Sequence, residues 1–205
     1  MSTRRFAVAT LLTGIIAGLV GLACIHLLHW IQGTAWDMHG GTLLNAVSAV
    51  SPARRVGVLT LAGIIGAVSW FLLFSRNKAI TSVSGAVSGT PMPPLRATWH
   101  ALTQVLVVGL GASVGREVAP REIAAAFSAA AADRLGLTPE DRRIIVACGA
   151  GAGLAAVYSI PLSGAIYTLE ILLVSLSARA VAPALITSGI AVLISTGFTR
   201  PTFFY

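Results

Sequence analysis

The stretch from Phe6 to Ile31 contains no Asp, Glu, Lys or Arg and is predominantly apolar. A helix needs about 20 consecutive apolar residues to cross the hydrocarbon core of a bilayer, so this stretch predicts a membrane-spanning helix. It is also longer than the apolar region of a secretory signal peptide, which has roughly 7–15 residues. We therefore interpret it as a retained helix, although Arg4 and Arg5 precede it.

The composition of the whole chain agrees with lipid as its solvent. Hydrophobic residues make up 56% of the sequence and charged residues only 10%, whereas a soluble domain carries about 25% charged residues. The 14 Lys and Arg against 7 Asp and Glu give a net charge of +7. No basic face with interleaved aromatic residues accompanies this charge, so we predict no nucleic-acid partner.

The other apolar segments differ widely in length and polarity. Val56–Phe74 is a second charge-free span, whereas Ala79–Leu95 is rich in Ser, Thr, Gly and Pro. The latter composition predicts a short helix or a re-entrant segment that is buried in protein. The remaining predicted helices are Ala97–Gly115, Ile123–Ala132, a helix that starts at the N-cap Thr138 and continues into Ile144–Leu169, and Ala180–Thr199.

Glycine and proline interrupt several of these helices. We split Ile144–Leu169 at Tyr158–Pro161, and a polar connection that contains Gly40 and Gly41 follows the first helix. The result is an all-α, polytopic membrane protein with seven or eight uneven, partly broken helices in one domain over residues 1–205. Half-length helices of this kind are typical of transporters, in which helix ends point at an ion near the membrane midplane.

The segment from Gly111 to Ile123, GASVGREVAPREI, carries the most chemistry. It places Arg116 and Glu117 directly before a short Ala-rich helix. Unpaired N–H groups at a helix start bind anions, and the Glu117 carboxylate can occupy the same place. A free anion would compete with it and protonation would favour its release, which describes a gate. The alternative is an ordinary helix cap, which stabilises by about 0.3–1 kcal/mol.

Two motifs in this chain resemble the CLC family of chloride channels and transporters. Gly115-Arg116-Glu117 resembles the signature GREGP, whose Glu is the external gate of the family. Downstream, the sequence YSIPLSGA at 158–165, followed by Leu169-Glu170, resembles FNAPLAG…LE. The two motifs occur in the family order, and the resemblance covers most of the chain. It implies the first of the two inverted repeats of a CLC protein, and chloride or another small anion as the ligand.

The resemblance also implies the site residues. Glu117 and Glu170 are expected to act in gating or proton movement, and the expected anion site consists of Lys78, Gly115, Arg116, Val118 and Ala119. Val118 and Ala119 replace the Gly and Pro of the signature, and Lys78 stands where a central Ser is expected. Lys78 is alternatively an interfacial residue, and Glu170 is alternatively part of a structural ion pair at a helix end. Ile171 replaces an acid of many proton-coupled members, which favours a passive channel or another proton route.

The second repeat, with its GxFxP loop, does not occur in this sequence. We therefore expect half a site. The chain is either a fragment of a longer protein or a separately encoded half that a second-half chain completes, and pairing of two copies is a third alternative. The resemblance also implies dimerisation of the family type. A prokaryotic plasma membrane is the expected location. Chloride against other anions, and channel against exchanger, stay open at this stage, and a non-transporting structural or regulatory subunit is the alternative function.

An intramembrane protease is the alternative from another class. Ser113 would need a base within hydrogen-bond reach, and His100 lies roughly 20 Å earlier at 1.5 Å per helical residue. We therefore predict no enzyme. We also predict no metal site and no cofactor, because His26 and His29 lack acidic or Cys neighbours, and Cys24 and Cys148 are interpreted as packing residues.

Overall fold

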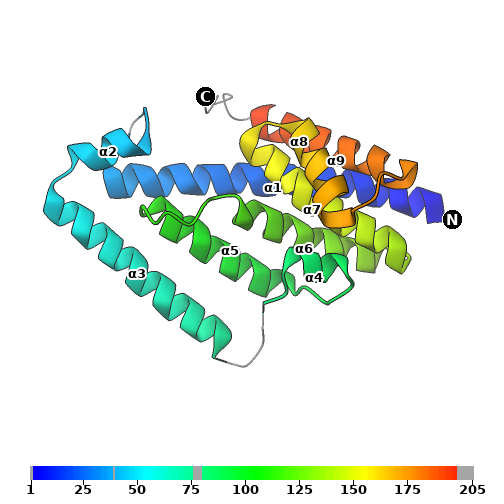
Figure 1. Ribbon diagram of the computed structural model, residues 1–205, viewed down its shortest axis with the longest axis horizontal. Helices are drawn as coiled ribbons and strands as arrows, with labels where there is room; N and C mark the ends of the chain where they lie inside the picture. The colour runs from blue at the N-terminus through cyan, green and yellow to red at the C-terminus, as the bar shows by residue number, and fades with distance from the viewer. Residues whose placement is uncertain (1, 39, 76–79, 198–205) are drawn as a thin grey trace.

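The computed structural model describes residues 2–38, 40–75 and 80–197, and within these ranges it contains helices and no strands (Figure 1). This confirms the predicted all-α class. The elements are α1 (Ser2–Trp36), α2 (Leu43–Ala49), α3 (Pro52–Phe74), α4 (Val83–Val87), α5 (Pro94–Gly109), α6 (Val118–Arg134), α7 (Pro139–Tyr158), α8 (Pro161–Ile166), the π-helix η1 (Tyr167–Leu173) and α9 (Ala178–Gly197).

Three helices in the described part of the chain are long and apolar enough to cross a bilayer: Thr3–Trp36, Pro52–Phe74 and Ala178–Gly197. In α3, only 17% of the most apolar window is buried inside the protein. Figure 1 shows this helix diverging from the rest of the molecule. Its side chains Val56 and Phe71 are 67% and 72% exposed, which is stable only against an apolar solvent such as lipid.

The centre of the molecule is α7, which packs against α1, α6, α8 and α9. Three alternate glycines allow this close approach. A methyl group at Gly149 would overlap Ser128 of α6, one at Gly151 would overlap Thr168 of η1, and one at Gly153 would lie 2.5 Å from the Pro120 carbonyl oxygen of α6. Small residues at helix contacts are the usual means of close packing in lipid.

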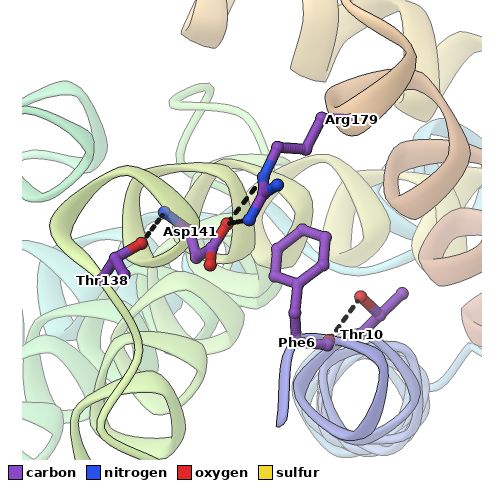
Figure 2. Close-up of polar contacts among 5 residues, drawn as sticks. All are labelled: Phe6, Thr10, Thr138, Asp141 and Arg179. Carbon is purple, nitrogen blue, oxygen red and sulfur yellow. Dashed lines mark hydrogen bonds and ion pairs between the residues drawn. The ribbon is translucent and has the colours of Figure 1, made fainter. Parts of the chain in front are cut away.

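The start of α7 is fixed by an ion pair whose carboxylate is buried and whose guanidinium is 56% exposed (Figure 2). Thr138 caps the helix as predicted, since its hydroxyl accepts a hydrogen bond from the Asp141 N–H. The Asp141 side chain is fully buried, and its Oδ1 accepts two hydrogen bonds from Arg179 of α9, at 2.9 and 2.7 Å. The Arg179 guanidinium also lies 5.4 Å from the ring centre of Phe6 on α1. Three helices therefore meet at one carboxylate.

Two predicted helix boundaries were wrong. The helix predicted over Ala97–Gly115 is α5 and ends at Gly109, because the chain turns at the left-handed Gly111, where the Ala112 N–H donates to the Val107 carbonyl oxygen. The Gly109 carbonyl oxygen, which the ended helix leaves unpaired, accepts a 3.0 Å hydrogen bond from the Trp36 indole N–H. The helix predicted over Ile123–Ala132 is α6 and already begins at Val118. Its first two turns are amphiphilic, with Arg121 and Glu122, so the uncharged run understated its length.

Three other expectations can be compared with the structure. The helix inside Ala79–Leu95 is α4, which has only five residues. The split at Tyr158–Pro161 is confirmed, since Ser159 is left-handed with φ of 57° between α7 and α8. The connection after the first helix was predicted as irregular, yet it contains α2, whose start is capped by Thr42.

Loss of Arg179 is expected to destabilise the protein more than neutralisation of Asp141. In Arg179→Met, a buried carboxylate remains without its partner, and breaking a buried ion pair in this way costs about 3–5 kcal/mol. In Asp141→Asn, the charge itself disappears, so about 1 kcal/mol of hydrogen bonding is lost. The measurement is the free energy of unfolding in detergent micelles.

Arg134→Met is the matched control, because Arg134 is exposed in the last turn of α6. It should change the unfolding free energy by less than about 1 kcal/mol. If Asp141→Asn lowered the free energy of unfolding as much as Arg179→Met, the cost would not arise from an unpaired buried carboxylate.

Candidate functional site

The candidate site is the start of α6 and the loop that leads to it. Gly111 and Gly115 have left-handed φ values of 101° and 85°, a conformation that glycine adopts without strain. A side chain at Gly111 would also lie 2.9 Å from the Trp36 ring. The loop therefore turns back after α5, and Figure 1 shows that α6 starts part-way along the length of α1.

The first turn of α6 offers few but well-defined backbone donors. Glu117 is the N-cap residue, and its side chain makes no capping hydrogen bond. The first N–H groups of a helix have no intrahelical partner, and Pro120 has no N–H to offer. The amides of Val118 and Ala119 therefore form the positive end of the α6 dipole. Ala119 is only 2% exposed, whereas Glu117 and Val118 are partly exposed, so this end is shielded from bulk water on one side only.

The Glu117 carboxylate bends back over the preceding loop. A methyl group at Gly115 would lie 2.6 Å from Oε1 and 2.7 Å from Oε2 of Glu117, so only a glycine leaves room for the carboxylate in this position. The side chain is half-buried. The negative Glu117 carboxylate therefore lies beside the start of α6 but makes no capping hydrogen bond to it.

Arg116 fixes the loop to the opposite wall of the site. Its guanidinium carbon lies 5.2 Å from the centre of the Tyr158 ring, at the last residue of α7. An arginine over an aromatic face gains about 0.5–1 kcal/mol or more when it is desolvated. The start of α6 and the end of α7, which carry the two motifs found in the sequence, are thus brought together.

The structure places the other predicted site residues differently. Gly115, Arg116, Glu117, Val118 and Ala119 are contiguous around the start of α6. Glu170 is exposed in the first turn of η1, and no contact among the described residues joins it to that start. Lys78 lies outside the described residues.

Sequence reasoning missed Glu122, which lies in the second turn of α6. Its Oε2 is 2.7 Å from Nδ1 of His100 on α5, and it is only 8% exposed. The sequence does show Glu122 as an acid directly before the apolar run that starts at Ile123. The sequence does not show that His100 is the partner of Glu122, because the approach of His100 depends on where α5 ends and on how the loop returns.

Comparison with known proteins gives the family. The family model described as voltage gated chloride channel matches residues 57–205. The chain belongs to this family. The match includes the start of α6, α7 and the motif around Pro161, as the resemblance implied.

Individual members of the voltage-gated chloride channel family match along nearly the whole chain. The voltage-gated ClC-type chloride channel ClcB of Escherichia coli O81 (strain ED1a) is 30% identical over 198 residues, which are 94% of this chain and 47% of ClcB. ClcB of Citrobacter koseri is 31% identical over 196 residues. The chain therefore spans about half the length of the curated relatives it matches.

A solved structure shows the same fold. The crystal structure titled as that of a slow cyanobacterial Cl⁻/H⁺ antiporter has a TM-score of 0.75 and 21% sequence identity, and the match covers 95% of this chain and 47% of that one. At this identity the likeness establishes the fold alone. The chain is thus an integral membrane protein with a fold of the chloride channel family.

Gly115→Ala is expected to lower the free energy of unfolding by more than the strain of a left-handed alanine, which is about 1–2 kcal/mol. The excess arises because the new methyl group overlaps the Glu117 carboxylate. In a Glu117→Ala background this excess should vanish, so the double-mutant cycle gives a coupling of about 0.5–3 kcal/mol. Unfolding in detergent micelles measures all four proteins.

Gly189→Ala is the control, because a methyl group at Gly189 would meet no atom within 4 Å. In this helical position alanine should be neutral or stabilising by up to about 1 kcal/mol. Full additivity of the Gly115 and Glu117 substitutions would mean that the carboxylate does not lie over Gly115.

Proposed function

We propose that this chain forms one half of a chloride path through the membrane, with Glu117 as its gate. The observation that carries the proposal is the position of the Glu117 carboxylate beside the uncapped, partly shielded start of α6. The Val118 and Ala119 amides attract an anion there without a full positive charge. A chloride ion and the carboxylate cannot occupy the same place, so each displaces the other.

Arg116 supports an anion over a cation as the ligand. Its guanidinium lies in the loop before α6, against Tyr158. It raises the electrostatic potential for negative ions at this end of the helix. Val118 and Ala119, in place of a Gly-Pro pair, give this start a differently shaped backbone. Lys78 and Glu170 are proposed as further contributors to anion binding and proton movement.

The chain is proposed to act together with a second half. Inverted-repeat transporters bind their substrates between the two repeats, and this chain spans about half the length of its relatives. We propose that it corresponds to the first repeat as a single membrane domain, and that the complete protein resides in a prokaryotic plasma membrane as a dimer.

We also propose that the chain is not an enzyme. His100 directs Nδ1 at Glu122 and has its Nε2 3.5 Å from the Gln104 side-chain nitrogen. Ser113, the one nucleophile considered from the sequence, is exposed in the loop between α5 and α6. The histidine is thus engaged elsewhere, and the pair does not form a nucleophile and its base.

Reconstitution in liposomes tests the proposed function. The chain alone should give little chloride flux. The completed transporter, which we define as this chain coexpressed with the part of E. coli O81 ClcB that it does not match, should give a flux that rises as the pH falls, because protonation releases the Glu117 carboxyl. In Glu117→Gln, which is neutral at every pH, the flux should no longer depend on pH.

Glu140→Gln is the matched control, because Glu140 is an exposed acid in the first turn of α7. Its flux should follow the wild type at each pH. Strong flux from the chain alone would contradict the half-path. An unchanged pH dependence in Glu117→Gln would contradict the gate, and a completed transporter without flux would favour a structural subunit.

A further inference from the structure

The membrane domain contains an ionisable pair that the proposed anion path does not use. This pair joins α5 to the second turn of α6. Nδ1 of His100 on α5 and Oε2 of Glu122 on α6 are 2.7 Å apart, and the two side chains are 15% and 10% exposed. Ionisable side chains within a membrane domain are costly, and they commonly mark ion or proton routes. A buried ion pair adds little net stability compared with apolar residues of the same volume. Packing alone therefore does not account for this pair.

The surroundings of the pair are otherwise uncharged in the described part of the chain. The Trp70 ring of α3 has its centre 6.3 Å from that of His100, and Gln104 of α5 approaches the second imidazole nitrogen. The helices α1, α3, α5 and α6 also share an apolar cluster. It includes Cys24, Leu28, Ala62, Ala101, Val105, Ala119 and Ile123. Cys24 is its one titratable member. No cation other than His100 contacts the Glu122 carboxylate among the described residues.

Two buried polar atoms of residues that contact His100 have no hydrogen-bond partner among the described residues. They are the Trp70 indole Nε1 and the Gln104 side-chain Oε1. One is a donor and the other is an acceptor. A donor and an acceptor that flank an imidazole–carboxylate pair are the groups that a proton-carrying water binds in a buried site. These atoms extend the pair into a polar cluster of four residues.

The position of Glu122 relates it to Glu117. Glu117 is the N-cap of α6 and Glu122 lies in its second turn, and five helical residues correspond to a rise of about 7.5 Å and a rotation of roughly 140°. Among the described residues, Asp141 is the other buried carboxylate, and it is bound to Arg179 at the start of α7. Glu122 is thus the buried acid on the same helix as the proposed gate. The separation is too large for direct transfer, so a proton between them passes through water.

We propose that His100 and Glu122 form an internal proton-binding site that exchanges protons with Glu117. The proposal rests on the proposed function. One proton lies between Nδ1 of His100 and Oε2 of Glu122, and a second proton enters the pair from one side of the membrane. This second proton passes through water to Glu117, which leaves the helix start when it is protonated and gives the proton up to the other side when the carboxylate returns. No electron transfer is involved, and the number of protons is conserved at each step.

Simultaneous measurement of proton and chloride fluxes tests this site in the completed transporter. The wild type should move protons when a chloride gradient is applied. Glu122→Gln and His100→Gln should lower the proton flux by about a hundredfold, which is the low end of what a positioned acid or base supplies. Their chloride flux should stay within a few-fold of the wild type. Glu122→Asp, which keeps a carboxylate, should restore part of the proton flux.

The controls separate this proposal from a structural role and from the proposed function. Glu140→Gln should leave the ratio of protons to chloride unchanged, and thermal unfolding identifies any variant that does not fold. An equal loss of both fluxes in folded Glu122→Gln would overturn the proposal, because a structural pair would act on both. Chloride flux without proton flux in the wild type would also overturn it, while the anion path would stand. Absence of both fluxes from the wild type would overturn the proposed function and this proposal together.

Discussion

A helix that starts inside a protein surrounded by lipid leaves unpaired N–H groups where no water can satisfy them, and the rest of this structure depends on how that end is accommodated. The start of α6 is enclosed because α7 can approach α6 at Gly149 and Gly153. The left-handed Gly111 ends α5 and allows the loop to return, and the Trp36 indole pairs with the Gly109 carbonyl oxygen that the helix leaves free. Small residues, one indole and two left-handed glycines together create a partly shielded site for negative charge.

The few charges of the chain are concentrated where they hold or operate this arrangement. Asp141 and Arg179 join α7 to α9, and Arg142 and Asp133 join the start of α7 to the end of α6 at 2.6 Å. These contacts fix the two helices that carry the motifs. Glu117, in contrast, makes no capping hydrogen bond, and the His100–Glu122 pair lies beside two uncharged groups that have no hydrogen-bond partner among the described residues. Groups that must change partners during transport have to be less tightly bound than groups that only hold helices together.

The sequence predicted those features that depend on the solvent and on local backbone chemistry. Phe6–Ile31 and Val56–Phe74 follow from the thickness of a bilayer, the break before Pro161 follows from proline, and the Thr138 cap follows from its hydroxyl. Features that depend on distant residues were missed. The partner of the Gly109 carbonyl oxygen at the end of α5 is Trp36, 73 residues away, and the partner of Glu122 lies 22 residues earlier on another helix. The motif gave the position of Glu117 correctly at a helix start, but not the bend of its carboxylate over Gly115.

The central claim is that an anion and the Glu117 carboxylate compete for the start of α6. Anomalous diffraction from crystals of the completed transporter grown in bromide tests it most directly, because bromide scatters anomalously and the carboxylate does not. The account predicts bromide density beside the Val118 and Ala119 amides in Glu117→Gln, with weaker density in the wild type. Equal density in both proteins, or none at this helix end in either, would contradict it.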